Sequence, residues 1–411
     1  MAQNYPKRIE IQEGIDLLLS HTGRMGKEKV EIHKAYGRIL ACRVLAKENI
    51  PPFDRSPYDG YAIRSADVAD AGHDTPVTLK IIEEVPAGHA PEKVVGPMEA
   101  VKILTGAPIP QGADAVVKYE DTSFTDKEVC FFSPIASGSN IVKAGEDVKT
   151  GEIVMEEGEH LSPASVGLLA GLGYGEVEVF KKPRVRIINT GDELLPVWEE
   201  LKPGKIRNSS AYMLQGFLRQ WGITADIYRI VRDDGDAIKN AITACLADAD
   251  CVITTGGASV GDYDLALSSM EGIGAEVLFW QVRMKPGMAT LAAVKDGRLL
   301  LGLSGNPSAA AAALFLLGLP AFRKMCGKKE YKVPSIPVCL PDGFPKKSPG
   351  GRIIPGILEF HQGKVCLNTR KNQANGMVSP WGGCNLIGMI PKGSDALLPG
   401  STIDALYLGE D

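Results

Sequence analysis

The spacing of apolar and polar residues changes several times along the chain. Residues 9–19 (IEIQEGIDLLL) place apolar side chains at positions 11, 15, 18 and 19, which predicts a helix. Residues 30–46 read as a strand, a short helix and a strand. Farther along, short apolar runs lie between Gly and Pro turns, at 77–82, 100–104, 115–119 and 129–132. Such runs predict a mostly β region.

Beyond Pro183 the pattern becomes one of strands that alternate with amphipathic helices. Strands are predicted at 185–188, 225–231, 251–254 and 277–282, with a strand pair at 291–294 and 299–302. Helices are predicted at 208–221, 237–246, 264–270 and 307–317. This alternation predicts a parallel sheet covered by helices on both faces. After residue 327 short β segments return, which indicates a small all-β domain of about 80 residues.

These changes divide the chain into four predicted domains. A mixed linker domain combines residues 7–46 with 144–180, and a mostly β domain with a proline-rich loop covers 47–143. A three-layer α/β domain covers 181–327, and the C-terminal β domain covers 328–411. The predicted fold class is therefore α/β plus β, in a multidomain chain.

Composition narrows the choice of protein class. The 411 residues are 44% hydrophobic and 23% charged, which is ordinary for a soluble globular protein. The net charge of −5 offers no broad basic surface, so nucleic acid is not expected as a partner. The start, MAQNYPKRIE, has no apolar signal segment, and residues 309–319 are too short to span a bilayer. We therefore expect a cytoplasmic location and no membrane partner.

The cysteines give no sign of a zinc site or a dithiol redox motif. There are eight, and no two form a CxxC pair. Cys245 and Cys251 fall in predicted core elements, so we expect both to be buried free thiols.

The stretch from Asp250 to Asp264 (DCVITTGGASVGDYD) is the first candidate for chemistry. A buried strand breaks into a loop with Gly256 and Gly257, and Asp262 precedes a predicted helix. Backbone N–H groups in such a loop hold anions, and acids beside them suit a cation such as Mg²⁺ on a phosphate. An ordinary strand-to-helix turn with a capping Asp is the alternative, and this stretch alone does not decide between them.

Polar residues follow five predicted strands in the same way. These loops are 189–193, 232–234, the one that holds Asp262 and Asp264, 283–287 and 303–307. If the sheet is parallel, they meet at one edge, where ligands of such folds bind. Acids in three of the loops can then hold Mg²⁺, while Lys285 and the glycine loops face a phosphate. A single charged loop residue is more often part of the solvated surface. The interpretation as a binding site therefore depends on several such loops meeting at one edge.

Two familiar motifs bear on the choice of enzyme class. The chain has no G-x-x-x-x-G-K-[ST] motif, so it is not a P-loop enzyme. Residues 302–306 (GLSGN) resemble a nucleophile elbow, but Asn306 replaces the second glycine, and only His361 lies downstream as a base. We interpret Ser304 as a loop or phosphate-contacting residue and keep a serine hydrolase as a weak rival.

Taken together, five motifs resemble one known family. They are 56–62 (SPYDGYA), 105–107 (TGA), 189–193 (NTGDE), 255–262 (TGGASVGD) and 285–287 (KPG). In this order they are similar to molybdopterin molybdenumtransferase, the MoeA family, which is related to the gephyrin E domain. The resemblance covers nearly the whole chain.

This resemblance implies an activity and its partners. Family members insert molybdate into adenylylated molybdopterin and release AMP and molybdenum cofactor, with Mg²⁺ as the divalent cation. The resemblance thus implies a transferase with small pterin and oxyanion substrates, and a molybdopterin adenylyltransferase as pathway partner. It also implies an elongated homodimer, in which the linker domain serves dimerisation and the active cleft joins two subunits.

The resemblance also carries over site residues by their match to its motifs. The catalytic candidates are Asp59, Thr105, Glu193, Asp233, Asp234, Asp262 and Lys285, with the choice between Asp233 and Asp234 open. The metal candidates are Asp59, Glu193 and Asp262. The candidates for binding the pterin substrate are Gly256, Gly257, Ser259, Gly261, Ser304, Gly305, Asn306 and Pro307. By itself, Asp59 before Gly60 would be read as a turn residue, and the resemblance reverses that preference.

The chemistry that these residues suit is electrostatic. Lys285, helped by Arg283 and backbone N–H groups, can hold a tetrahedral dianion such as molybdate. Cleavage of a phosphoanhydride needs charge stabilisation more than a protein nucleophile. A binding or scaffold protein is the second hypothesis, because a shared fold does not fix function.

Three positions depart from the family pattern. Met288 stands where a second lysine is usual, Ser304 replaces a proline, and Tyr58 replaces a methionine. The missing lysine bears on oxyanion affinity, and the choice between molybdate and tungstate stays open.

Overall fold

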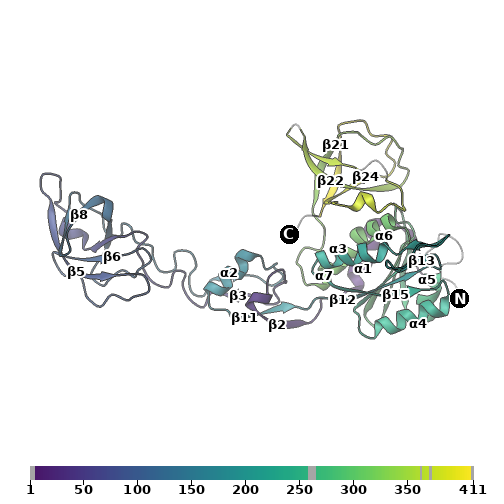
Figure 1. Cartoon of the computed structure of the whole chain (residues 1–411), viewed down its shortest axis with the longest axis horizontal. Helices are drawn as coiled ribbons and strands as arrows, with labels where there is room; N and C mark the ends of the chain where they lie inside the picture. The colour runs from purple at the N-terminus through teal and green to yellow at the C-terminus, as the bar shows by residue number, and fades with distance from the viewer. Residues whose placement is uncertain (1–4, 258–264, 362, 370–372, 409–411) are drawn as a thin grey trace.

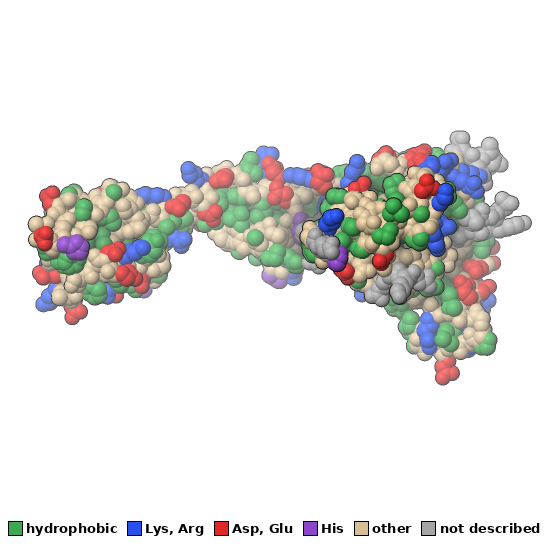
Figure 2. Space-filling model, turned by 90° about the horizontal axis from the view of Figure 1, so that it is seen from above, with side chains coloured by type: hydrophobic (Ala, Val, Ile, Leu, Met, Phe, Trp, Pro, Cys, Tyr) green, Lys and Arg blue, Asp and Glu red, His purple; other side chains and the backbone are tan. Residues whose placement is uncertain are grey.

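The computed structural model describes residues 5–257, 265–361, 363–369 and 373–408. The molecule is elongated, with a β domain at one end, a small linker domain in the middle, and an α/β domain at the other end with the C-terminal β domain beside it (Figure 1). Seen from above, a narrow neck joins the end β domain to the linker domain (Figure 2). Basic and acidic side chains are interspersed on the face shown, in keeping with the net charge of −5 (Figure 2).

A seven-stranded sheet forms the centre of the α/β domain, in the order β1-β17-β19-β20-β16-β12-β15. Its strands are β1 (Lys7–Ile9), β12 (Arg184–Thr190), β15 (Thr224–Val231), β16 (Cys251–Thr255), β17 (Glu276–Val282), β19 (Leu291–Lys295) and β20 (Arg298–Leu303). β15, β12, β16 and β20 are parallel, as predicted. β19 is antiparallel to its neighbours β20 and β17, so the sheet is mixed and β17 runs in the direction of the parallel strands.

Helices cover both faces of this sheet, so the domain has three layers. They are α1 (Ile11–His21), α3 (Ser210–Gln220), α4 (Gly235–Leu246), α5 (Leu265–Gly272), α6 (Pro307–Ala313) and α7 (Leu319–Met325). Buried side chains of α1, α3, α6 and α7 share one core cluster with one face of the sheet. Those of α4 and α5 share another with the opposite face. Cys245 and Cys251 are buried free thiols, as predicted.

The helix that begins at Pro307 is longer than the predicted 307–317. α6 continues through a π-helical turn, η4 (Leu314–Gly318), into α7. Pro320 lacks a backbone N–H, and a π turn is one way in which a helix accommodates such an interruption. The helix spans 19 residues and is long and apolar enough to cross a membrane, but 89% of its most apolar window is buried inside the protein. It is therefore a core helix here.

The prediction that residues 7–46 belong wholly to the linker domain is wrong for the first part. Lys7 and Ile9 pair with Trp280 and Val282, so β1 is an edge strand of the α/β sheet. α1 follows it, and Leu18 is fully buried in the core of the same domain. The apolar face of α1 correctly predicted a helix, but its spacing carries no information about which domain that face covers.

The linker domain is built from two separate parts of the chain. Its elements are β2 (Lys27–Glu31), η1 (Ile32–Lys34), β3 (Val44–Leu45), β10 (Ile153–Met155), α2 (Pro163–Gly171) and β11 (Glu176–Phe180). β2 pairs with β11 and β3 with β10, which joins the two parts. Ser162 caps the start of α2, because its Oγ accepts a hydrogen bond from the Ser165 N–H at 3.1 Å.

A six-stranded sheet forms the domain at the far end, in the order β7-β4-β6-β5-β9-β8. The elements are β4 (Gly60–Ile63), η2 (Ser65–Val68), β5 (Val77–Val85), β6 (Glu99–Ile103), β7 (Ala115–Lys118), η3 (Tyr119–Asp121), β8 (Thr122–Phe124) and β9 (Glu128–Phe131). Tyr61 is fully buried there, and its ring contacts those of Tyr119, Phe124 and Phe131.

The C-terminal domain is a small barrel. Its elements are β18 (Met284–Lys285), β21 (Ser335–Leu340), β22 (Gly351–His361), β23 (Lys364–Asn368), η5 (Ser379–Trp381), β24 (Leu386–Ile390) and β25 (Ser401–Tyr407). The sheet closes because β22 pairs with both β23 and β24. Trp381 stacks on Phe315 of η4 at 5.6 Å between ring centroids, so the barrel packs directly on the core helix.

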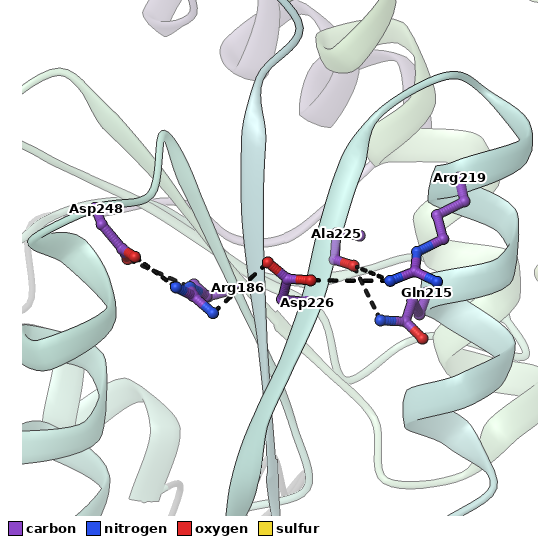
Figure 3. A network of polar contacts seen from close by, with 6 residues as sticks. All are labelled: Arg186, Gln215, Arg219, Ala225, Asp226 and Asp248. Carbon is purple, nitrogen blue, oxygen red and sulfur yellow. Dashed lines mark hydrogen bonds and ion pairs between the residues drawn. The ribbon is translucent and has the colours of Figure 1, made fainter.

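A chain of polar contacts ties β12, β15 and two helical segments together (Figure 3). Arg186 of β12 forms ion pairs with Asp248, just after α4, and with Asp226 of β15. Arg219 of α3 pairs with Asp226 at 3.8 Å and donates to the Ala225 carbonyl, which also accepts from Gln215. These contacts hold α3 against the start of β15.

Candidate functional site

The carboxyl ends of β12, β15, β16, β17 and β20 lie at the same edge of the α/β sheet, as the sequence predicted. From β12 the chain crosses to β15 on one side and then returns to β16 on the other. The loops after β12 and β16 therefore diverge at a topological switch point. Open α/β sheets bind ligands in the crevice at this point.

The loop after β12 presents Glu193 to solvent beside this crevice. Its ends are fixed by the Gly191 N–H, which donates to Val231 O, and by Ile206 N–H, which donates to Glu193 O. β13 (Leu194–Leu195) and β14 (Ile206–Arg207) then pair beyond it. A Cβ on Gly191 would lie 2.6 Å from Glu193 Oε2, so the carboxylate folds over the glycine. Glycine at 191 thus makes room for the Glu193 side chain.

Two neighbouring acids follow β15, and the structure gives them different surroundings. Asp234 is the N-cap of α4, and its Oδ1 accepts a hydrogen bond from the Ala237 N–H at 2.8 Å. Asp233 is exposed, and its carboxylate has no hydrogen bond or ion pair within the described ranges. The Asp234 side chain is therefore engaged in capping, which leaves Asp233 as the candidate for a ligand.

The glycine loop after β16 sits close to the neighbouring strand ends. Gly256 and Gly257 have φ angles of +86° and +61°. A Cβ on Gly256 would lie 2.2 Å from the Thr190 carbonyl oxygen, so the left-handed backbone and the close approach both require glycine. Of the other predicted residues in this loop, Ser259, Gly261, Asp262 and Asp264 lie outside the described residues.

Polar side chains are buried beneath this loop. Asn189 donates from Nδ2 to Thr255 Oγ1 at 2.5 Å. Asn189 Oδ1, Thr190 Oγ1 and Thr254 Oγ1 are buried without a hydrogen-bond partner among the described residues. A buried polar atom without a partner is costly, so each of these three atoms can accept a hydrogen bond from a water molecule or from a bound group.

The loop after β20 forms the next part of the edge. A Cβ on Gly305 would lie 3.3 Å from Gly256 Cα, so the loops after β16 and β20 are in contact. Asn306 and Pro307 begin α6 there. Ser304 is buried, and its Oγ accepts from the Asn306 N–H at 3.2 Å. No histidine is a hydrogen-bond partner of Ser304 in the part of the chain that the structure describes, which removes support for a serine hydrolase.

Lys285 lies on the short strand β18, where the α/β domain meets the C-terminal barrel. It is exposed, and its register partner on β22 is Arg352. The Arg352 Nε is buried without a hydrogen-bond partner among the described residues, and its guanidinium lies 5.1 Å from the Phe344 ring. Met288 is 41% exposed on the same segment. Two cations therefore lie on paired strands, in a region where Met288 supplies none.

Asp59 and Thr105 come together in the end β domain, although 46 positions separate them. Asp59 Oδ1 accepts hydrogen bonds from the backbone N–H and the hydroxyl of Thr105, both at 2.7 Å. The N–H and then the hydroxyl hold the pKa of the Asp59 carboxyl below its ordinary value. Asp59 precedes β4, at the opposite end of the molecule from the α/β domain (Figure 1). Within one chain this pair does not reach Glu193 or Lys285.

The predicted metal ligands are consequently not assembled in one chain. Among the described residues no group of three or more His, Cys, Asp or Glu side chains is placed to hold a metal ion. Asp59 lies in the distant domain, Glu193 lies at the strand ends, and Asp262 lies outside the described residues. Carboxylate oxygens are the donor type that Mg²⁺ prefers, but Asp59 and Glu193 lie too far apart in a single chain to bind the same ion.

Comparison of the sequence with known proteins identifies its family. Residues 9–173 match the model described as the MoeA N-terminal region, domains I and II. Residues 186–324 match a model described as a probable molybdopterin binding domain. The chain is 37% identical, over 98% of its length and 96% of the relative's, to a molybdopterin molybdenumtransferase of Staphylococcus aureus strain Mu50. The chain belongs to the MoeA family of molybdopterin molybdenumtransferases.

Other MoeA relatives agree with this assignment. A molybdopterin molybdenumtransferase of Staphylococcus epidermidis strain RP62A is 34% identical over 97% of this chain and 95% of its own. A crystal structure titled as the molybdopterin biosynthesis MoeA protein of Pyrococcus horikosii superposes with a TM-score of 0.84. That pair shares 29% identity over 98% of this chain and all of the other. The structural similarity to this MoeA protein therefore extends over nearly the whole chain.

Sequence reasoning missed part of this MoeA-family edge, because the C-terminal barrel supplies it. Arg352 is the register partner of Lys285 in the pairing of β18 with β22. The Asn375 carbonyl accepts a hydrogen bond from the Ser308 N–H at 3.1 Å, and a Cβ on Gly376 would lie 3.7 Å from Asn306 Oδ1. A Gly-Gly-Arg run at 350–352 is the one local signal that could have singled out Arg352.

Proposed function

We propose that the protein inserts molybdate into adenylylated molybdopterin, releasing AMP and molybdenum cofactor. The observation that carries the proposal is the meeting of the loops after β12, β15, β16 and β20 at one sheet edge. This edge joins glycine loops, which suit phosphate, to exposed acids and cations. Membership of the MoeA family supports the choice of substrates. The proposed location of the enzyme is the cytoplasm. Its proposed substrates are small pterin and oxyanion molecules.

Lys285 and Arg352 are proposed to hold the molybdate. A tetrahedral dianion is bound best by charge-assisted hydrogen bonds, and these two cations lie on paired strands. The unpartnered Nε of Arg352 provides a donor that a bound oxyanion would satisfy. Arg352 would then supply the second cation that Met288 does not.

The glycine loops are proposed to hold the phosphate and pterin parts of the substrate. Gly256, Gly257, Gly305 and Asn306 lie in two loops that touch each other. The N-terminus of the core helix lies at the same edge, and its dipole favours a negative charge there, although Pro307 has no N–H and the Ser308 N–H already donates to the Asn375 carbonyl. The buried, unpartnered hydroxyl of Thr190 lies beside Gly256 and would gain a partner from a bound substrate or from an ordered neighbour.

Glu193 and Asp233 are proposed to position the reacting groups from the opposite side of the crevice. Both are exposed at the ends of adjacent strands, β12 and β15. Mg²⁺, when bound, would offset the charge of the phosphoanhydride. Because one chain does not assemble the ligands, no step of this proposal is assigned to the metal.

The complete site is proposed to form between two copies of the chain. Asp59 and Thr105 are held to each other but lie at the far end of the molecule from Glu193 (Figure 1). An elongated chain in a symmetric dimer can place its end domain against the α/β domain of its partner. Asp59 of one subunit would then lie beside the acidic residues of the other subunit's strand-end loops and complete the site.

Release of AMP tests the activity. Purified protein is mixed with adenylylated molybdopterin, Mg²⁺ and molybdate, and AMP is measured by chromatography beside a known insertase. We expect AMP release that depends on molybdate, with a smaller yield for Lys285→Met. Tight pterin binding without AMP release would reject the insertase and favour a scaffold protein. The adenylyltransferase expected as pathway partner can be coupled to supply the substrate.

A mixing experiment tests the shared site separately. Asp59→Asn and Asp233→Asn homodimers are each expected to keep at most about one tenth of the wild-type activity. After subunit exchange, about one quarter of the sites would be free of both changes, because half the dimers are mixed and each has one intact site. Activity near that level supports a site made by two subunits. If both variants dimerise and no activity returns on mixing, both residues act within one subunit.

A further inference from the structure

A cavity lies near the amino ends of the parallel strands of the α/β sheet, where three domains meet. It has a volume of about 340 Å³, within the range of small-molecule sites. Arg38 of the linker domain, Trp221 of the α/β domain and Tyr407 of the C-terminal barrel all line it. We call this the junction cavity.

The junction cavity is separate from the candidate active site. Lys182 precedes β12, and Ile223 precedes β15, so both lie at the amino ends of the parallel strands. Glu193 and Asp233 follow the carboxyl ends of the same two strands. Because a strand of seven or eight residues separates the two sets, a ligand in the cavity cannot touch the active-site loops.

Most of the charged side chains that line the cavity come from the linker domain and the α/β domain. The basic side chains are Arg38, Lys181, Lys182, Arg219, Arg323 and Lys328, together with His160. No Asp or Glu is among the described residues that line it. A concave surface with charge of one sign attracts ligands of the opposite sign.

Three of these cations have structural tasks. Arg38 pairs with Glu28 and donates to the Phe180 carbonyl, Arg219 pairs with Asp226 (Figure 3), and Arg323 donates to the Glu330 carbonyl. A guanidinium has five N–H donors, so these contacts leave further donors for a ligand. Lys181 and Lys182 add further positive charge to the lining.

Burial and neighbouring cations disfavour the charged form of two lysines in the cavity, and a bound anion would offset this effect. Burial and the nearby Arg323 lower the pKa of Lys328 to about 8. Burial and Arg38 likewise lower the pKa of Lys182. Desolvated like charges destabilise one another, and a bound anion would offset that repulsion.

The remaining walls are aromatic. Phe180 and Phe322 are buried, and Trp221 packs edge-on against Phe315 with centroids 4.9 Å apart. Packing thus fixes the position of the indole. A surface of this kind suits a flat apolar group beside the charged one.

We propose that the junction cavity binds a small phosphate-bearing molecule with a planar apolar part. The phosphate would lie between Lys182 and Lys328, with the planar part against Trp221. Because residues of three domains line the cavity, a ligand there would also stabilise the junction of the linker domain with the α/β domain. This inference does not depend on the insertase activity.

Calorimetric titration of the full-length protein with AMP tests the proposal, with adenosine and inorganic phosphate as comparison probes. Lys328→Met and Lys182→Met should each weaken AMP binding by about tenfold or more, the loss of one charge-assisted contact. Lys329→Met, at an exposed neighbour outside the cavity lining, should leave it unchanged. Wild-type protein should also gain thermal stability with AMP.

A further variant separates this site from the strand-end edge. Lys285→Met should not change AMP binding at the junction cavity. Loss of AMP binding in Lys285→Met, with retention in both cavity variants, would overturn the proposal. So would equal binding of adenosine, or no binding of AMP or phosphate. Circular dichroism confirms that each variant is folded, and removal of the exposed Lys182 charge or the half-buried Lys328 charge is not expected to unfold the protein.

Discussion

Thr105 donates two hydrogen bonds to one oxygen of Asp59, from its backbone N–H and from its hydroxyl, and each is 2.7 Å long. Asp59 follows a proline-rich loop and Thr105 follows β6, so the end β domain brings them together from different strands. The pair fixes the orientation of an exposed carboxylate. It also keeps that carboxylate ionised to lower pH than usual.

Thr105→Val removes the hydroxyl contact and keeps the backbone one. We expect the pKa of Asp59 to rise part of the way toward its ordinary value. The lowered pKa means that the native hydrogen bonds stabilise the ionised carboxylate. That stabilisation is lost as the pH falls through the folded-state pKa of Asp59. If ionised Asp59 is required, the acid limb of the rate profile should therefore move to higher pH. Nuclear magnetic resonance titration of the carboxyl checks the pKa directly.

Thr105→Ser is the matched control for that shift. Serine retains both the N–H and a hydroxyl, so the pKa and the acid limb should stay close to those of the wild type. A profile that moves equally in both variants would show that the Thr105 methyl group, rather than the hydrogen bond, sets it.

The two acids after β15 should respond differently to substitution. Asp233→Asn should lower activity by about tenfold or more while leaving the unfolding midpoint unchanged. Asp234→Ala removes the N-cap of α4 and should cost about 1 kcal/mol of stability. Urea unfolding and AMP release measure the two effects. Asp234→Asn keeps a capping group, so a large loss of activity in that variant would instead make Asp234 functional.

Met288→Lys should strengthen molybdate binding. The side chain is 41% exposed, and Met288 O accepts hydrogen bonds from Val282 and Thr290, which hold the backbone in place. A lysine there would add a cation to Lys285 and Arg352. We expect the molybdate concentration for half-maximal rate to fall by about tenfold.

Arg352→Met makes the opposite change and should raise that concentration. If Met288→Lys restores the loss in the double variant, the two cations act on the same anion. An unchanged molybdate dependence in Arg352→Met would remove Arg352 from the oxyanion site.

Gly256→Ala should destabilise the protein more than a change at an open glycine. The new Cβ would lie 2.2 Å from the Thr190 carbonyl oxygen, and the left-handed φ adds about 1–2 kcal/mol. Gly37 has a φ of +71° and no atom within 4 Å of its Cβ position, so Gly37→Ala isolates the backbone cost. Urea unfolding of both variants gives the difference. Equal losses would mean that the loop moves freely away from Thr190.

Local pattern was enough to predict most elements of the α/β domain. Alternation of strands and helices predicted β12, β15, β16, β17 and β20, and their parallel direction follows from the crossovers between them. Because the carboxyl ends of such strands share an edge, the candidate loops could be grouped from the sequence. The MoeA resemblance supplied Asp59 and Thr105, which no local pattern placed near that edge.

Only the tertiary structure decided how residues from separate domains combine. β1 joined the α/β sheet although its neighbours in sequence build the linker domain, because strand pairing depends on long-range contacts. Arg352 came beside Lys285 through the barrel, and Asp234 was assigned to capping by one hydrogen bond. The junction cavity draws on three domains, and periodicity within one segment contains no information about such meetings. The sequence by itself determined the elements and the chemistry of their loops, whereas packing between distant segments determined which loops can act together.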